Sequence, residues 1–153
     1  MEGASGLVIE DKMLIRKLLY EVEEALKVLK SRVDEGVRDI GDAFAVRYAI
    51  IQIVECLAII SSKLAEVHGA VIEGYVEAMK FLSRLGIVDS EAGEALVRLA
   101  RLRNLLVHRY WVIDDGRIIK EVRESGIRAI EVAVEGVRRL LEGQGLLKGQ
   151  KAV

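Results

Sequence analysis

Helical periodicity runs through almost the whole chain, and it limits the possible folds more than any other feature. In residues 10–33, apolar side chains return every three or four positions, with lysines and glutamates between them. This spacing is typical of an amphipathic helix that buries one face. The apolar stripe consists of Leu14, Leu18, Ala25 and Leu29. Because no segment sustains the alternation of a half-buried strand, the sequence predicts an all-α fold.

The second helical segment is apolar on nearly all sides. We expect it to begin with Asp42 as its N-terminal cap and to run to about His68. A helix without a polar face has to be covered by others, so this one should be central. Its apolar stretches, around 49–60, are interrupted by Gln52 and Glu55 and are too short to span a bilayer, which takes ~20 apolar residues.

Three more helical segments complete the pattern. The first covers 71–85 and is stopped by Gly86. The second starts at Asp89 or Ser90, and its core stripe consists of Leu96, Leu99, Leu102 and Leu106. The third covers roughly 118–142 and follows a turn at 114–116. Four or five helices with short connections predict an up-and-down bundle.

Length and composition fit one soluble domain. The chain has 153 residues, of which 52% are hydrophobic, and this is enough for one core. We expect a single domain over 1–153, with its core in about 10–142 and a frayed tail over 143–153. One cysteine cannot form an intrachain disulfide, and the N-terminus has no signal-peptide pattern. These features predict a cytoplasmic protein without a membrane segment.

Arginines are concentrated between Ala95 and Ile113, where no acidic residue occurs. The cationic and titratable side chains of this stretch are Arg98, Arg101, Arg103, His108 and Arg109. The net charge of the chain is only −1, so the positive charge is local. Arginine offers phosphate oxygens a planar fork, histidine can transfer a proton, and Tyr110 can stack on a base. These groups suit a phosphodiester-cleaving or RNA-binding site.

The same cluster also has structural explanations. An arginine-rich helix end is often a solvated face or a partner for the helix dipole. A lone histidine is more often structural than catalytic, and we expect Trp111 to close the core. Asn104, however, is the only asparagine in the chain. Depletion of Asn, Gln and Cys beside many Glu, Lys and Arg residues is typical of a thermophilic source.

Helix geometry separates two of the candidate residues. Arg103 and His108 are five positions apart, so ~140° lies between them on an ideal helix, whereas Asn104 and His108 share a face. Arg103 and His108 meet only if the helix distorts, if the Arg103 side chain wraps around it, or if two copies face each other in a symmetric dimer. We expect the dimer.

The motif region resembles a known family. The chain matches the R-x4-H-x-Y signature of the HepT-like toxins of the HEPN superfamily. The three signature positions are occupied by Arg103, His108 and Tyr110. The sequence LVRLARLRNLLVHRYWVID is similar to the typical motif region of that family, including Asn104 after the arginine and Asp114 after the aromatic pair.

The resemblance extends to the helices before the motif. RYAIIQIVECLAII resembles the long apolar helix of the family with an embedded glutamate, here Glu55. FLSRLGIVDSEAGEAL resembles the segment that leads into the motif helix. In all, the resemblance covers roughly residues 10–142.

Membership of this family implies an HEPN-like homodimer in which two motifs meet at the interface. Active members are metal-independent endoribonucleases, and they are toxins whose antitoxin partner is a minimal nucleotidyltransferase. The resemblance therefore implies an RNA substrate and no cofactor. Cleavage would use the 2′-hydroxyl of the RNA as the nucleophile and leave a 2′,3′-cyclic phosphate.

The resemblance also implies a role for each residue of the motif region. Arg103 would bind the scissile phosphate, and His108 would transfer a proton. Asn104 and Arg109 would bind or orient the substrate. Tyr110 would contact RNA and would be the residue to which the partner attaches AMP.

Outside the motif, Glu55, His68 and Cys56 carry the remaining polar or reactive groups of interest. Glu55 either pairs with an arginine of the motif helix and positions it, or faces water at the end of the bundle. His68 and His108 are the only histidines, and neither lies in an E-x-x-H pattern, so we expect no metal site. Cys56 is expected in the core.

Two other functions remain open from the sequence. The bundle could be a non-catalytic nucleotide- or substrate-binding subunit of a minimal nucleotidyltransferase. It could also be a generic helical dimer in which the motif is structural. An assay for RNA cleavage distinguishes the non-catalytic binding subunit from a ribonuclease.

Overall fold

The computed structural model describes residues 6–143, and every regular element in that range is helical. The all-α prediction is confirmed for this part of the chain. The elements are α1 (Ile9–Glu35), α2 (Ile40–Val67), α3 (Tyr75–Arg84), α4 (Ser90–His108), the 3-10 turn η2 (Tyr110–Val112), α5 (Asp115–Glu121), the π-helical turn η3 (Val122–Gly126) and α6 (Ile127–Leu141). Beyond Gly143, the expected frayed tail falls outside the described residues.

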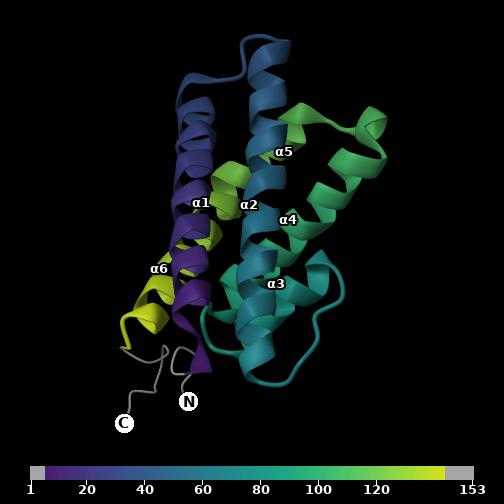
Figure 1. The fold of residues 1–153 in the computed structure, drawn as a ribbon. Helices are drawn as coiled ribbons and strands as arrows, with labels where there is room; N and C mark the ends of the chain where they lie inside the picture. The colour runs from purple at the N-terminus through teal and green to yellow at the C-terminus, as the bar shows by residue number, and fades with distance from the viewer. Residues whose placement is uncertain (1–5, 144–153) are drawn as a thin grey trace.

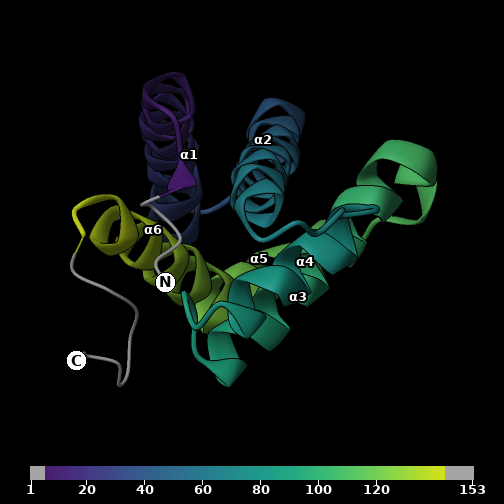
Figure 2. The same ribbon diagram turned by 60° about the horizontal axis from the view of Figure 1, so that its bottom comes forward.

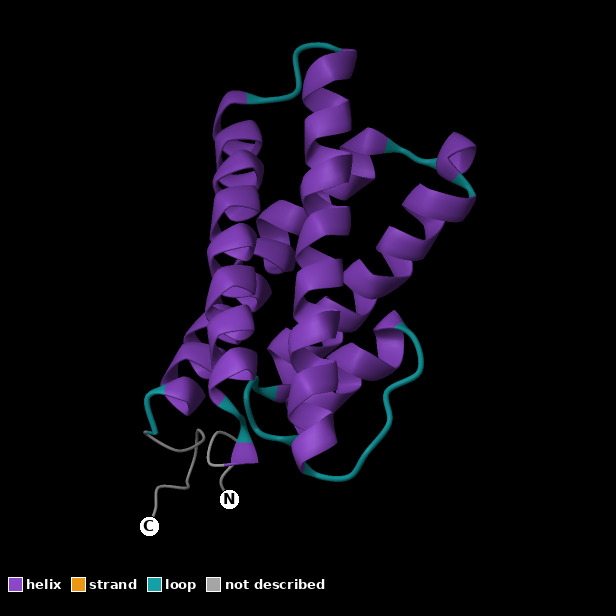
Figure 3. Ribbon diagram, viewed as in Figure 1, coloured by secondary structure: helices purple, strands orange, loops and turns teal. Residues whose placement is uncertain are grey.

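The helices form two layers. α1 and α2 lie side by side and antiparallel as one layer, and α3 to α6 lie across them as the other (Figures 1 and 2). α5, η3 and α6 follow one another without a break, so they form one long helix with a π-helical insertion. The described chain is thus a bundle of five helices joined by loops (Figure 3), within the four to five expected.

α2 is the central helix, as its apolar sequence predicted. It contacts α1, α3 and α4, and the side chains of Ile53, Leu57 and Ile60 are almost completely buried. The buried hydroxyl of Ser61 donates a hydrogen bond of 2.8 Å to the backbone carbonyl of Ala78 in α3. This bond satisfies the hydroxyl and fixes α3 against α2.

α2 is long and apolar enough to cross a membrane by length and composition alone, so the expectation that its apolar stretches are too short was wrong. Half of its most apolar 18-residue window is buried inside the protein. The core helix of a soluble protein has the same length and composition. The packing of α2 against three other helices is that of a core helix.

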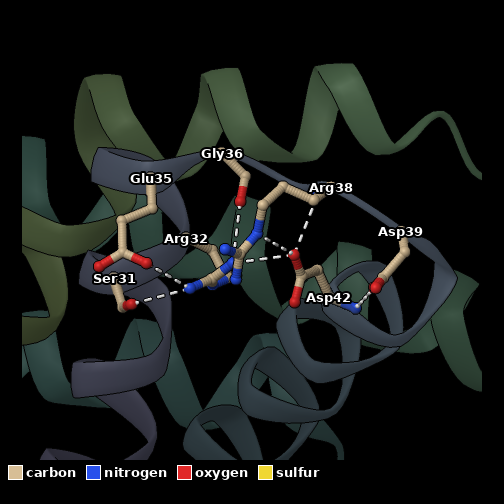
Figure 4. Close-up of polar contacts among 7 residues, drawn as sticks. All are labelled: Ser31, Arg32, Glu35, Gly36, Arg38, Asp39 and Asp42. Atoms are coloured by element: carbon tan, nitrogen blue, oxygen red, sulfur yellow. Dashed lines mark hydrogen bonds and ion pairs between the residues drawn. The ribbon is translucent and has the colours of Figure 1, made fainter.

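Arg32 organises the turn between α1 and α2 (Figure 4). Its guanidinium donates to Oδ2 of Asp42 at 2.8 Å and to the carbonyl of Gly36 at 3.1 Å. Asp42 is therefore not the N-cap of α2. The cap is Asp39, whose carboxylate accepts from the backbone N–H of Asp42 at 2.9 Å. The backbone N–H of Arg38, and then the two guanidinium groups, hold the pKa of the Asp42 carboxyl below its ordinary value.

The buried face of α1 is rotated relative to the predicted stripe. Ile15, Leu19 and Val22 are at most 3% exposed, whereas Leu14 and Leu18 are only half-buried. The other two residues of the predicted stripe are buried as expected. The predicted stripe is therefore shifted by part of a helical turn from the observed one. Two adjacent apolar rows exist on α1, and the packing against α2 and α6 determines which of them is buried.

The last helix begins earlier than expected, at Asp115. The Oδ1 of Asp114 accepts from the backbone N–H groups of Gly116 at 3.0 Å and Arg117 at 3.4 Å, so the predicted turn is a helix cap. Asp115 also forms two hydrogen bonds of 2.9 Å with Arg47 of α2. This bidentate pair ties the start of α5 to the central helix.

Candidate active site

α4 carries most of the predicted site. It begins at one of the two predicted starts, because Asp89 accepts a 2.7 Å hydrogen bond from the first turn. It remains α-helical through His108, and the N–H of Arg109 still donates to the carbonyl of Leu105 at 2.7 Å. Arg109 then leaves the helical conformation, with φ −142° and ψ 48°, and Tyr110 starts η2.

The side chain of Arg103 points from α4 toward α2 and α3. Its Nη2 donates to Oε2 of Glu55 at 2.7 Å, and its Nη1 donates to Oδ1 of Asn104 at 3.2 Å. The ring of Tyr75, the first residue of α3, lies 4.0 Å from the guanidinium carbon. Three helices therefore meet at one arginine. Of the two alternatives for Glu55, the pairing with the motif helix is the one observed.

This arrangement compensates the burial of a charge. The Arg103 side chain is 11% exposed, whereas that of Glu55 is 44% exposed. A buried guanidinium is costly unless it is paired, and Glu55 and the face of the Tyr75 ring both favour its charge. Among the described residues, Nε of Arg103 is the buried side-chain nitrogen that lacks a hydrogen bond. The guanidinium is held in place without all of its donors being used.

His108 and Arg103 do not come together within one chain. The α4 backbone is undistorted at His108, and Arg103 is held by Glu55 and Tyr75 and does not wrap around the helix. Asn104 and His108 are on the same face, as predicted, because the helix is regular between them. His108 is exposed to solvent. Among the described residues, Arg103 forms its side-chain hydrogen bonds with Asn104 and Glu55 and not with His108.

The aromatic pair after the helix is exposed. Tyr110 is 61% exposed and Trp111 68%, and their rings pack edge to face with centroids 5.4 Å apart. The expectation that Trp111 closes the core was wrong. α4 ends at His108, and the backbone at this end of the helix projects away from the rest of the bundle (Figure 1), which fits the exposure of the indole.

Comparison with protein families identifies the chain. The family model for the HepT-like ribonucleases matches residues 18–137. The chain belongs to the HepT-like ribonuclease family. A protein of Archaeoglobus fulgidus, whose name gives RNase as a provisional assignment, is 31% identical over 108 residues, which is 71% of this chain and 81% of the relative. The resemblance found in the sequence is thereby confirmed.

Solved structures of HEPN toxins share the fold. The tri-AMPylated HEPN toxin of Shewanella oneidensis, in complex with its MNT antitoxin, has a TM-score of 0.72 at 13% identity, over 82% of this chain and 96% of that chain. A chain of a mutant MntA–HpeT toxin–antitoxin complex has a TM-score of 0.69 at 14% identity, over 82% and 97%. YutE, a cytosolic protein of Bacillus subtilis of unknown function, has a TM-score of 0.75 at 20% identity, over 84% and 89%.

The positive charge of this HepT-like chain is smaller around the motif than the sequence indicates. Arg98 donates to Glu121 at 2.9 Å, and Glu55 neutralises Arg103. Arg101 and Arg109 are exposed, and neither forms an ion pair with another described residue. Acidic residues that are distant in the sequence thus reduce the net positive charge of the arginine cluster. The sequence around the motif could not indicate this reduction.

Apolar side chains are exposed on both sides of the site. On α2, Ile40, Phe44 and Tyr48 are each more than half exposed, and helical spacing places them on the same face as Glu55. On α4, Val107 is 40% exposed and lies one turn beyond the arginine. The first half of α2 and the end of α4 diverge in both ribbon views (Figures 1 and 2), and the apolar side chains named here are exposed in the described chain. An unpartnered apolar face of this kind is typical of a protein–protein contact.

Tyr75 was not anticipated as part of the site. It lies 28 positions before Arg103, on a different helix, and no local pattern connects the two. Among residues 6–143, no group of three His, Cys, Asp or Glu side chains is close enough together to hold a metal ion. His68 ends α2, and its Nδ1 lies 3.0 Å from the carbonyl of Leu64. Cys56 is a core residue, and burial raises the pKa of its thiol to about 11.

Proposed function

We propose that this chain is a metal-independent endoribonuclease and the toxin of a HEPN/minimal-nucleotidyltransferase pair. The observation that carries the proposal is the placement of Arg103. A guanidinium whose orientation is fixed by Glu55 and Tyr75 is a preorganised partner for a phosphate. Membership of the HepT-like ribonuclease family supports the same activity. The depletion of Asn, Gln and Cys favours assays at elevated temperature. A cytoplasmic location fits the fold shared with YutE, a cytosolic protein.

RNA can be cleaved with the groups that this motif supplies. The ribose 2′-oxygen attacks the adjacent phosphorus, and the phosphorus–O5′ bond breaks. The 2′-hydroxyl proton goes to a base, and O5′ receives a proton, so the products are a 2′,3′-cyclic phosphate and a 5′-hydroxyl. His108 transfers a proton in this step, and Arg103 stabilises the charge that develops on phosphorus-bound oxygens. Asn104, Arg109 and Tyr110 bind or orient the RNA.

The proposed site is composite, with residues from two copies of the chain. Since Arg103 and His108 do not meet within one chain, the second copy supplies the histidine that faces each arginine. The exposed apolar faces of α2 and α4 flank the motif and support a homodimer that buries them. The salt bridge at Arg103 would then lie at the edge of the interface.

Regulation by the partner is proposed to act at Tyr110. Tyr110 is 61% exposed and follows α4 after one residue, so a nucleotidyltransferase could reach its hydroxyl. The phenolic oxygen would attack the α-phosphorus of ATP, form a bond to AMP and release pyrophosphate. The tri-AMPylated toxin of S. oneidensis, in complex with its MNT antitoxin, supports this inference.

RNA cleavage by the unmodified protein tests the activity. Wild-type protein produced without its partner is expected to cleave single-stranded RNA in EDTA and to leave cyclic phosphate ends. His108→Ala should abolish cleavage. His68→Ala is the matched control, because that histidine ends α2 and should leave the rate unchanged. RNA with 2′-deoxyribose at the cleaved position should stay intact.

One observation favours a non-catalytic nucleotide-binding subunit as the second candidate. Glu55 pairs with Arg103 in the described chain, and this pairing reduces the positive charge that the arginine can offer to the transition state of cleavage, whereas binding without cleavage needs no such stabilisation. If the unmodified wild type leaves RNA intact at every temperature at which it is folded, this second function replaces the first.

A further inference from the structure

A groove of about 460 Å³ lies beside the Arg103–Glu55 pair. One wall is a face of α2 that begins at Glu55 and continues for two turns toward the end of the helix. The other wall is the segment that leads into α3 and includes Tyr75. The two residues that hold the arginine thus also line the groove. A molecule bound in the groove therefore contacts the two residues that hold the guanidinium, although Arg103 itself does not line the groove.

The walls of the groove are mainly apolar. Ala58 and Ile59 line it from α2, and Ile72 lines it from the α2–α3 connection. Ile59 is 43% exposed, which is unusual for an isoleucine on the central helix of a bundle. At the start of α3, Gly74 has a φ of 92°, and a side chain there would meet nothing within 4 Å. The groove is therefore open along this wall.

Three polar groups in the groove have hydrogen-bonding capacity to spare. Glu55 uses Oε2 for Arg103, and its Oε1 has no hydrogen bond to a described residue. The Ser62 hydroxyl likewise has none with the part of the chain that the structure describes. Lys63 is 3.5 Å from Asp11 and 3.9 Å from Glu66, longer than a good charge-assisted hydrogen bond. Apolar walls with a few convergent polar groups are typical of a small-molecule site.

We propose that this groove binds the nucleobase of a ribonucleotide whose phosphate lies at Arg103. The inference rests on the proposed function only in taking Arg103 as the phosphate-binding residue. The two charged residues of the groove, Glu55 and Lys63, each have a partner of opposite charge, so the groove suits a neutral ring better than a second phosphate. A base has the flat apolar faces that Ile59 and Ile72 can contact, and its edge can exchange hydrogen bonds with Ser62 and its two charged neighbours.

The ribonucleotide could be one unit of an RNA strand or a free mononucleotide. Both present the same base, ribose and phosphate, so both fit this site. In an RNA strand, the bound base would belong to a nucleotide next to the scissile phosphate. It would then determine part of the sequence preference of the enzyme.

Binding measurements without any cleavage step test the site. The probes are AMP, GMP, CMP and UMP, with ribose 5-phosphate as the ligand that lacks only the base. At least one mononucleotide should bind the full-length wild type roughly tenfold more tightly than ribose 5-phosphate, the effect expected of one base contact. Ser62→Phe fills the groove and should remove this difference while leaving the affinity for ribose 5-phosphate unchanged.

Ala45→Phe is the matched control, since it adds the same ring to an exposed position on α2 outside the groove. It should keep the preference for the mononucleotide. An NMR titration of the unsubstituted protein provides a readout that needs no variant to fold. The methyl signals of Ile59 and Ile72 should shift with AMP or another mononucleotide and not with ribose 5-phosphate.

The outcomes separate this site from the ribonuclease activity. Equal affinity for all mononucleotides and ribose 5-phosphate overturns the base site, as does a preference that survives Ser62→Phe. A base preference in a protein that does not cleave RNA retains the site and rejects the ribonuclease. A 2′-O-methylated trinucleotide that binds more tightly than its mononucleotides assigns the groove to RNA, and equal binding assigns it to a free nucleotide.

Discussion

Glu55 of α2 and Arg103 of α4, 48 positions apart in the sequence, form an ion pair of 2.7 Å in which the two partners are unequally exposed. The glutamate is 44% exposed and can be hydrated without its partner, whereas the arginine is 11% exposed and cannot. The pair therefore links the central helix to the motif helix, and the two residues depend on it to different degrees.

Removing Glu55 should destabilise the fold more than removing Arg103. Glu55→Leu leaves a buried guanidinium without its counter-charge and should lower the free energy of unfolding by about 2 kcal/mol. Arg103→Met leaves a hydrated carboxylate and should cost under about 1 kcal/mol. Urea denaturation measures both. The double variant should be more stable than Glu55→Leu alone, and equal losses in the two single variants would argue against this asymmetry.

The ring of Tyr75, and not its hydroxyl, should support catalysis. A cation–π contact at a desolvated site is worth about 1–2 kcal/mol, so Tyr75→Leu should reduce kcat for RNA cleavage roughly tenfold. Tyr75→Phe keeps the aromatic face and should retain nearly the full rate. Both variants should fold as the wild type does by circular dichroism. If Phe and Leu reduce kcat equally, the aromatic face does not position Arg103.

Tyr110 should be the residue that the partner modifies. Protein coexpressed with its nucleotidyltransferase should gain the mass of AMP, and mapping should place it on Tyr110. Tyr110→Phe should prevent the modification. Tyr20→Phe is the control, because Tyr20 has a similar exposure of 59% and lies on α1, far from the motif in sequence. Modification that persists in Tyr110→Phe would refute this assignment without affecting the nuclease proposal.

The bidentate pair of Arg47 and Asp115 should protect the segment around η2 from proteolysis. Asp115→Asn removes the charge of the pair and should weaken the attachment of α5 by about 1 kcal/mol. Because Arg109 lies in the segment that this attachment restrains, tryptic cleavage there should become roughly fivefold faster. Asp34→Asn, at a position without an ion pair among the described residues, should leave the rate unchanged. Unchanged cleavage in Asp115→Asn would show that the pair does not restrain η2.

The cap of α4 should contribute to stability in a pH-dependent way. The backbone N–H of Ala92, and then Arg128, lower the pKa of the Asp89 carboxyl below its ordinary value of 3.8. A lowered pKa in the folded state means that the stabilisation is fully present above this ordinary value and is lost as the pH falls through the folded-state pKa. Asp89→Ala should therefore lower stability by about 1 kcal/mol at pH 7.

Urea denaturation of wild type and Asp89→Ala at pH 7 and at pH 2 checks this prediction. The difference between the two proteins should shrink at the lower pH, because protonation of the Asp89 carboxyl removes the charge that the N–H of Ala92 and Arg128 stabilise. A difference that stays constant over this range would mean that the charge of Asp89 does not contribute to the cap.

The local features of the fold could be predicted well. Helix positions follow from periodicity, and Asp89 and Gly86 mark helix ends because caps and left-handed residues act on their own neighbours. Errors occurred where two local solutions were available. Asp39 and Asp42 can both cap α2, and the side chain of Arg32 engages Asp42, which leaves the cap to Asp39.

The exposure of Trp111 could not be predicted from composition. A tryptophan is usually a core residue in a small bundle, but α4 ends before it and directs it away from the core. In the same way, the observed acidic partners of Arg98 and Arg103 are Glu121 and Glu55, which are supplied by other helices and lie far away in the sequence. Burial and charge compensation depend on which helix faces meet.

The sequence by itself determined that this protein is helical and that its family motif is Arg103, His108 and Tyr110, because periodicity, caps and motif spacing are properties of neighbouring residues. It also determined that the first two of these residues point in different directions from one helix. Only the tertiary structure decided that Arg103 is held between Glu55 and Tyr75, beside a groove. Those contacts join residues far apart in the chain, and they exist only once α2, α3 and α4 are packed together.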